Sequence, residues 1–306
     1  MASFHDTFAA DYPRQGALTK EQLQRLYVKN KFELTKHVSA VVGAKAQYFG
    51  GNDWFISWYS APEGAEIHNG LEHQDVPDQH VPAALDAVKH NLKDRRFNWV
   101  TGPQDQNRLE YHLRRQDFTV DEQEPVMVVD LRQQTEAMRA AVPNGIRIGD
   151  IDSWRVRDWV KAWSGHAPVE ATTHWTQIYD TMLNTLHRKQ FCMFMAQQGG
   201  RVIGTGYLHC FAGIASIHAI AVVPELRGNG IGKALTAYGM QRAASIGYNI
   251  STLTSSRAGL NVFQSLGFKE FGVVKLNVWR PLIDRGTIEN EQKEALEAEQ
   301  EGWCLV

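Results

Sequence analysis

The sequence is poor in cysteine, and its three cysteines are far apart. Cys192, Cys210 and Cys304 are too few and too scattered for the disulfide framework of a small secreted domain or for a zinc site. The sequence therefore predicts no bound metal and a reducing, cytoplasmic setting. The first residues lack a basic segment followed by an apolar core, so we expect no signal peptide.

Long apolar runs and an excess of charge of one sign are also missing. Nowhere are 18 consecutive residues apolar, which argues against a membrane-spanning helix. The formal net charge is −2, from 32 basic and 34 acidic residues. This balance offers no general attraction to nucleic acid or to anionic membranes, and we expect neither as a partner. The oligomeric state stays open, with a homodimer as one option.

The remaining composition is that of an ordinary globular protein in a chain long enough for two domains. The 306 residues are 43% apolar and 22% charged. A polar stretch over 132–145 ends in Pro143-Asn144-Gly145, and we place the domain boundary there. We therefore expect one domain over 1–135 and a second over 146–281. Residues 282–306 are acidic with little apolar face, which predicts a solvated tail.

The periodicity of apolar residues predicts an α+β fold in both halves. In the first half we expect a hairpin over 47–59, helices over 18–42, 83–93 and 107–115, and strands over 97–100 and 126–131. In the second half we expect a helical region over 153–187 with breaks near Gly165 and Pro168, helices over 230–246 and 259–266, and strands over 191–197, 201–211, 215–223, 250–255 and 271–279. Both halves end in a short helix and an apolar strand. This rhythm favours duplication of one α+β unit, with two unrelated domains as the alternative.

One segment of the second half combines an apolar strand, a glycine-rich loop and the start of a helix. The strand ends at Pro224, and Arg227-Gly228-Asn229-Gly230-Ile231-Gly232 leads directly into the helix. Free amide groups at a helix N-terminus attract anions, and glycines let the backbone approach phosphate oxygens. The arrangement predicts a phosphate-bearing ligand.

Two common phosphate motifs do not fit this loop. A Walker loop would need a glycine at Arg227 and a serine or threonine at Ala234. A dinucleotide fingerprint would need a glycine at Lys233 or Leu235. What remains is Arg-x-x-Gly-x-Gly between a strand and a helix.

This pattern resembles the cofactor motif of the GNAT acetyltransferase superfamily. The resemblance extends to Val222-Val223-Pro224 before the loop, and to Asn261, Phe263 and Leu266-Gly267-Phe268 after it. It covers about 146–281. The first half resembles the degenerate first unit of tandem GNAT proteins, since Gly70 is the single glycine between Asn69 and Ala83. The resemblance implies two tandem GNAT-like units, each a mixed, mostly antiparallel sheet flanked by helices, with one cofactor site in the second.

The resemblance also implies an activity and a set of binding residues. The chain would be an acetyl-CoA-dependent N-acetyltransferase, in which the primary amine of a small molecule attacks the thioester directly. Acetyl-CoA would be the cosubstrate. The strand backbone would bond the pantetheine arm, the loop amides would hold the pyrophosphate, and α-helical Asn261 would touch the pantetheine. The residues implied in cofactor binding are Ile220, Ala221, Val222, Arg227, Gly228, Asn229, Gly230, Ile231, Gly232, Lys233, Asn261 and Phe263.

The usual acid and base of the family are replaced. Phe263 stands where the family often has a tyrosine that protonates the departing thiolate, and Ser256 is one substitute hydroxyl. Ser216 stands where the family usually has a glutamate base. His218, two residues further on the same strand face, is the candidate base, with a pKa suited to accepting a proton near neutrality. A hydrogen-bonded strand histidine is the alternative reading of His218 and of His209.

Two further interpretations stay open at this stage. An aromatic and histidine-rich region lies where the family builds its substrate side, although such residues more often fill the core or the surface. It contains Trp159, Trp163, His166, Glu170, His174 and Trp175. The alternatives to small-molecule acetylation are a protein or peptide N-acetyltransferase and a non-catalytic acyl-CoA-binding or regulatory protein.

Overall fold

The protein was analysed as a computed structural model, which describes residues 18–50, 54–62, 68–92, 95–103, 107–133, 136–165 and 167–281. These residues form two compact units that interleave along the chain. Among the described residues, unit 1 joins 18–33 with 127–271, and unit 2 joins 34–126 with 272–281. The predicted domain boundaries at 135 and 146 stay a prediction. The predicted tail over 282–306 and His166 lie outside the described residues.

Unit 1 is built on a mixed sheet with the strand order β5-β10-β9-β8-β7-β6. Strands β6 to β9 are antiparallel neighbours, whereas β9 and β10 run parallel. The strands are β6 (Arg147–Asp150), β7 (Phe191–Gln198), β8 (Arg201–Phe211), β9 (Ile214–Val222), β10 (Ile250–Thr254) and the end of β5 (Thr119–Asp130). The helices are α4 (Val156–Ser164), α5 (Val169–Thr185), α6 (Ile231–Ser245), α7 (Leu260–Ser265) and the first part of α1 (Lys20–Val41). Short 3-10 turns are η3 (Leu131–Gln133), η4 (Ala137–Arg139), η5 (Ser153–Arg155) and η6 (Pro224–Leu226).

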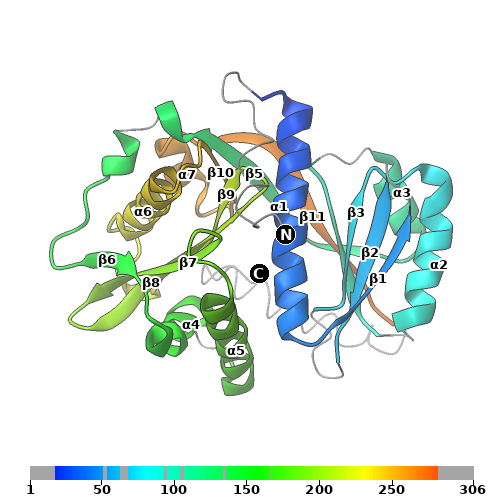
Figure 1. Cartoon of the computed structure of the whole chain (residues 1–306), viewed down its shortest axis with the longest axis horizontal. Coiled ribbons are helices and arrows are strands. Elements are labelled where there is room, and N and C mark those ends of the chain that lie inside the picture. The colour runs from blue at the N-terminus through cyan, green and yellow to red at the C-terminus, as the bar shows by residue number, and fades with distance from the viewer. Residues whose placement is uncertain are drawn as a thin grey trace, which may run out of the picture. The chain divides into compact units, whose positions relative to one another are not determined.

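Helices cover both faces of the sheet of unit 1 (Figure 1). On one face, fully buried Trp159 of α4 and buried Tyr179 of α5 pack against Tyr207 of β8. On the other, the side chain of Ile217 lies directly against the backbone of Gly239 in α6. Successive residues of a strand point to opposite faces of the sheet, so the two helical layers pack against alternate residues of the same strands.

The first part of α1 is tied to the hairpin between β8 and β9 by one buried amide. Asn30 is 2% exposed, and its Nδ2 lies 3.0 Å from the carbonyl oxygen of Ile214, 3.1 Å from that of Phe211 and 3.3 Å from that of His209. The helix begins with a capping box, since Thr19 and Gln22 exchange side-chain to backbone hydrogen bonds. No helix within the described ranges combines the length and the apolar character that a membrane span requires.

Unit 2 has its own hydrophobic core. Its strand order is β1-β2-β3-β4-β11-β5, from β1 (Lys45–Gly50), β2 (Phe55–Ser60), β3 (Gly70–Gln74), β4 (Phe97–Thr101), β11 (Lys269–Trp279) and the start of β5. Its helices are α2 (Val81–Leu92), α3 (Asn107–Arg115), the end of α1 and the 3-10 turn η2 (Asp78–His80). Fully buried Trp99, Phe97 and Leu85 centre the core.

The two units repeat one connectivity. In unit 1, β7, β8 and β9 are antiparallel neighbours, and α6 then leads to the parallel strand β10. In unit 2, β1, β2 and β3 are antiparallel neighbours, and α2 leads to the parallel strand β4. This shared order favours the duplication that the sequence indicated. The α+β fold and the predicted helices are confirmed, whereas β3 and β6 were not anticipated.

Gly206 of β8 marks a place where the sheet has no room for a side chain. A Cβ atom there would lie 2.3 Å from Cε2 of Phe194, which is fully buried, and 2.8 Å from Cδ1 of Ile220. We predict that Gly206→Ala lowers the free energy of unfolding by about 1–3 kcal/mol because the core must shift. Urea unfolding followed by circular dichroism measures this change.

The matched control is Gly149→Ala in β6, where an added Cβ meets nothing within 4 Å. This variant should differ from the wild type by less than about 0.5 kcal/mol. Equal destabilisation by both substitutions would contradict the packing argument.

Candidate functional site

The central feature of unit 1 is a pair of parallel strands that separate. Strands β9 and β10 are in register only at Ile214–Ser216 against Ile250–Thr252. Residues 217–222 of β9 continue along β8 without a register partner on β10. The β9 backbone thus presents an open hydrogen-bonding edge beyond Ser216. An extended ligand can add to such an edge as another strand does.

A β-bulge lies where the strands separate. Thr205 of β8 is in register with Ala221 and Tyr207 with His218, so Gly206 faces two residues, Ala219 and Ile220. Ala219 has φ +52°, which is uncommon for a residue with a Cβ. The hydroxyl of Thr205 donates to the carbonyl of Ala219 at 2.8 Å and holds this conformation.

The glycine-rich loop lies at the end of β9 and is open where a ligand would approach. Gly228 and Gly230 have φ values of +77° and +79°, which favour glycine. A Cβ atom at either position would meet nothing within 4 Å, so the space beside both glycines is empty of protein atoms. Gly228, Asn229 and Gly230 are all exposed. The loop therefore forms an accessible backbone surface.

Two side chains fix the shape of this loop. Nε of Arg227 donates to the carbonyl of Val222 at 3.0 Å, which ties the loop back to the end of β9. The side-chain amide of Asn229 lies 3.2 Å from the carbonyl oxygens of both Leu226 and Arg227. Both Val222 and Arg227 are predicted to bind the cofactor, and the carbonyl oxygen of Val222 already accepts a hydrogen bond from Arg227.

Helix α6 starts immediately after the loop. Its N-cap residue is Gly230, which has no side chain that could accept hydrogen bonds from the first amides of the helix. Ile231 is 1% exposed and anchors the first turn in the core, whereas Lys233 is exposed. The amides and the positive end of the helix dipole fit an anion, and the glycine conformations leave room for phosphate oxygens.

Helix α7 carries the two remaining residues of the predicted cofactor set. Asn261 is exposed, and Phe263 is 7% exposed and packs edge-on against Phe268. A Cβ at Gly259 would lie 2.7 Å from the Phe263 ring, so the ring is tightly held. Ser256 follows β10 and is half-buried, and its carbonyl accepts from the Ser255 hydroxyl at 2.8 Å.

His218 lies at the separation of the strands, and its environment corrects one expectation. Its Nε2 is 2.8 Å from Oγ of Ser216, which confirms that the two side chains share a face. Burial, and secondarily the positive charge of Lys31, lowers the pKa of His218 from 6.5 to about 4. The prediction that His218 has a pKa near neutrality was wrong, because burial of the ring disfavours the charged imidazolium. His209 is fully buried and contacts Oδ1 of Asn30 at 3.3 Å.

Sequence reasoning missed two residues that touch this group. Tyr207 stacks on His218 with ring centroids 4.9 Å apart and an interplanar angle of 16°. Asn30 reaches the same cluster from α1, accepting from Ser216 at 2.7 Å. The alternation of β8 was a usable signal for Tyr207. Nothing local in α1 pointed to Asn30, which is 186 positions from Ser216.

The aromatic region of α4 and α5 is a stack that continues from Tyr207. Trp159 and Trp163 are stacked at 6.1 Å, and both contact Tyr179. Trp175 stacks on Tyr179 from the same helix. Trp159 is fully buried and Trp163 is 7% exposed, so these two rings are core. His174 and Glu170 lie on α5, and burial lowers the pKa of His174.

Unit 2 also has separating strands but a different connection. Strands β3 and β4 are in register only at Gly70 with Asn98 and Leu71 with Trp99. The connection from β3 to α2 runs through η2 and contains no glycine. The N-terminal half thus keeps the parallel pair without the glycine-rich loop.

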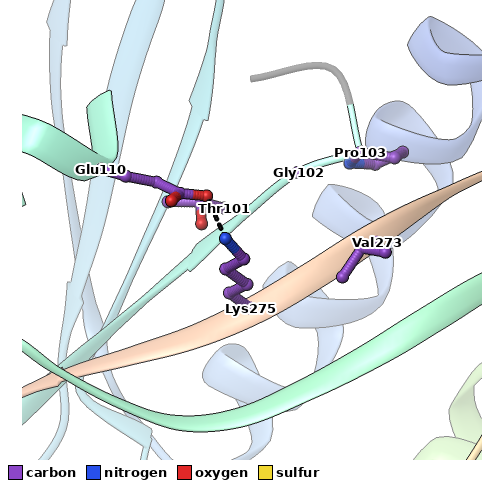
Figure 2. A pocket seen from close by; sticks show the side chains of 6 residues that line it. All are labelled: Thr101, Gly102, Pro103, Glu110, Val273 and Lys275. Atoms are coloured by element: carbon purple, nitrogen blue, oxygen red, sulfur yellow. Dashed lines mark hydrogen bonds and ion pairs between the residues drawn. The ribbon is translucent and has the colours of Figure 1, made fainter. Parts of the chain in front are cut away.

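A pocket of about 200 Å³ in unit 2 is separate from the residues predicted for the cofactor (Figure 2). Nζ of Lys275 in β11 lies 2.5 Å from Oε1 of Glu110 in α3, so the two charged groups in it neutralise each other. The pocket is lined by Thr101, Gly102, Pro103, Glu110, Val273 and Lys275. Across the described ranges, histidine, cysteine and carboxylate side chains form no group of three that would hold a metal ion.

Three comparisons with known proteins agree with this geometry. The model of the acetyltransferase (GNAT) family matches residues 149–268, which contain β9, the loop and α7. The mycothiol acetyltransferase of Streptomyces avermitilis is 31% identical over 80 residues, which are 24% of this chain and 26% of that relative. The chain thus matches about a quarter of that relative's length.

Solved structures show the same fold over most of the chain. A GCN5-related N-acetyltransferase from Kribbella flavida superposes with a TM-score of 0.64 at 14% identity, covering 82% of this chain and 93% of the other. A tandem GNAT protein from the clavulanic acid biosynthesis pathway gives a TM-score of 0.60 at 14% identity, covering 82% and 94%. The two GNAT-like units expected from the sequence are thus found in the fold. Residues 149–268 are thus similar to the GNAT family of acetyltransferases, and the chain as a whole shares the fold of tandem GNAT proteins.

Proposed function

We propose that unit 1 is an acetyl-CoA-dependent N-acetyltransferase that acylates the primary amine of a small molecule. The observation that carries the proposal is the open edge of β9 leading directly into an uncapped, glycine-rich helix start. An extended pantetheine arm and a pyrophosphate match these two surfaces in that order.

Each surface has a defined task in binding. The backbone of Ile220 and Ala221 bonds the pantetheine arm as an added strand, and Asn261 contacts it from α7. The amides from Gly228 to Lys233 hold the pyrophosphate oxygens. Arg227 shapes the loop through its bond to Val222 and adds positive charge near the phosphates.

The transfer needs two proton movements around one bond exchange. The amine nitrogen donates its lone pair to the thioester carbon, and the carbonyl π electrons move to oxygen. The nitrogen then loses one proton, the carbonyl reforms, and the carbon–sulfur bond breaks. The thiolate takes up a proton, so an amine and an acetyl thioester give an acetamide and free CoA thiol.

His218 is the proposed acceptor of the amine proton. With a pKa of about 4 it is neutral at physiological pH, and its lone pair is therefore available. So weak a base cannot remove a proton from a free ammonium. It accepts one once attack on the thioester has made the nitrogen acidic. The thiolate is protonated by water or by Ser256, because Phe263 has no hydroxyl.

A small-molecule acceptor agrees with the composition and with two relatives. The net charge of −2 gives no broad docking field for a charged protein substrate. One relative is named for mycothiol and a structural neighbour for the clavulanic acid pathway. Tyr207, which stacks on His218, gives the acceptor side an apolar surface.

The alternative is a non-catalytic acyl-CoA-binding or regulatory protein. The absence of a hydroxyl at Phe263 and of a carboxylate at Ser216 favours it. Release of free CoA from acetyl-CoA with a panel of glucosamine, lysine, spermidine and tyramine separates the two functions. Tight binding of acetyl-CoA in calorimetry without turnover of any amine would favour the regulator.

We predict that Gly230→Asp weakens the binding of CoA by about tenfold or more, because a carboxylate would enter the space for the phosphates. Isothermal titration with CoA measures the dissociation constant. The matched control is Gly200→Asp in the β7–β8 turn, which has φ +84° and equally open surroundings. It should bind CoA as the wild type does. Unchanged affinity in a folded Gly230→Asp variant would remove the basis of the assignment.

For protonation of the thiolate, we predict that Phe263→Tyr changes turnover by less than about tenfold, because a thiolate with a solution pKa of about 8.5 leaves without much help. The steady-state rate of CoA release with the most active amine of the panel measures kcat. Ser256→Ala tests the substitute hydroxyl and should lower kcat if that group donates. A larger gain from Phe263→Tyr would mean that no efficient acid replaces the tyrosine.

The lowered pKa of His218 predicts an acid-labile fold. Between pH 6.5 and about 4 the unfolded chain binds a proton at this position that the folded chain rejects. Stability therefore falls as the pH drops through that window, by at most about 1.4 kcal/mol per pH unit from this group. Urea unfolding between these limits should show a shallower decline in His218→Gln.

A further inference from the structure

A buried amide in the first part of α1 determines how the cluster around His218 is hydrogen-bonded. Nδ2 of Asn30 lies 3.0–3.3 Å from three backbone carbonyl oxygens, at His209, Phe211 and Ile214. Carbonyl oxygens only accept, so the NH₂ group must face them. Oδ1 of Asn30 therefore faces Ser216 as an acceptor, and the orientation of the amide is fixed by its partners.

Ser216 has one hydroxyl proton and two acceptors that compete for it. Its Oγ lies 2.7 Å from Oδ1 of Asn30 and 3.0 Å from the carbonyl oxygen of His209. Neither group can donate, so the hydroxyl proton goes to one of them. The lone pairs of Ser216 Oγ then face Nε2 of His218 at 2.8 Å. His218 must be the donor in that hydrogen bond.

The neutral imidazole is thereby restricted to one tautomer. With the proton on Nε2, Nδ1 carries the lone pair and is the basic atom. Tyr207 stacks on the ring at 4.9 Å with an angle of 16°, which also fixes the plane of the imidazole. Ser216 is 2% exposed and Tyr207 6%, so both supports are themselves held by packing.

The position of Ser216 explains why this support matters at the site. Ser216 is the last residue of β9 in register with β10, opposite Thr252. His218 is the next side chain on the same face and the first beyond the separation of the strands. The hydroxyl thus lies in the paired part of the sheet, while the imidazole belongs to the open part.

We propose that Ser216, oriented by Asn30, is a positioning residue that holds His218 as the Nε2–H tautomer and leaves Nδ1 as the proton acceptor for the amine. This inference rests on the proposed acetyltransferase function. When Nδ1 takes the proton, Nε2 still carries its own and still donates to Ser216. The support therefore persists in both charge states, and the ring needs no rotation during transfer.

The direct test is the protonation pattern of the His218 ring in nitrogen-15 NMR near neutral pH. In the wild type, Nε2 should carry the proton and Nδ1 should give the shift of an unprotonated nitrogen. In Ser216→Ala the two shifts should move toward each other as the tautomers exchange. A wild-type ring protonated on Nδ1 would overturn the proposal, whether or not the protein is an enzyme.

Kinetics with the most active amine of the panel test the role in transfer. Ser216→Ala should lower kcat by about 10- to 100-fold, with the KM for acetyl-CoA unchanged, because only the orientation of the base is lost. Ser216→Thr keeps a hydroxyl and should recover most of kcat. The matched control is Ser251→Ala in β10, which removes a fully buried hydroxyl bonded to the Ala215 carbonyl at 2.8 Å. It should keep the wild-type kcat.

The outcomes separate failure of this inference from failure of the proposed function. Full activity in Ser216→Ala together with a large loss in His218→Ala would refute the positioning role while leaving the base in place. Full activity in His218→Ala would refute the catalytic base itself, and with it the positioning role. If Ser216→Ala does not fold, the wild-type ring shifts and the Ser216→Thr kinetics decide the matter.

Discussion

The architecture of unit 1 depends on the loss of pairing between two parallel strands. Beyond Ser216 and Thr252, β9 follows β8 alone, and the bulge at Ala219 re-aims its last residues. Buried backbone groups must find partners, so an unpaired edge inside a fold is costly unless a ligand or solvent completes it. Everything proposed for this unit lies along that edge or at its end.

The second constraint is the short path from the strand to helix α6. Pro224 ends the strand region, two glycines take positive φ values, and buried Ile231 starts the helix. Because Ile231 is locked in the core, the first amides of α6 stay at the end of β9. Arg227 strengthens this arrangement by bonding the carbonyl of Val222. The strand edge and the helix start therefore form one continuous surface.

The chemistry beside the edge is arranged by residues distant in sequence. Helix α1 supplies Asn30, and β8 supplies Tyr207, to a cluster that centres on Ser216 and His218 of β9. The same connectivity occurs in unit 2, where β3 and β4 also separate but no glycine-rich loop follows. Separating parallel strands occur in both units, so the glycine-rich loop is the feature that distinguishes unit 1 from unit 2.

The sequence by itself determined the α+β class, the family resemblance and the place of the loop, because these depend on local patterns. Strand alternation, helical spacing, and glycines between a strand and a helix are legible within a few residues. It did not reveal β3, whose Gly-Leu-Glu-His-Gln lacks β-branched residues, or the short strand β6. The structure alone decided the interleaving of the units, the contact of Asn30 with Ser216, and the neutral state of His218. Each of these arises from burial and from contacts between segments far apart in the chain, and a local pattern carries no record of them.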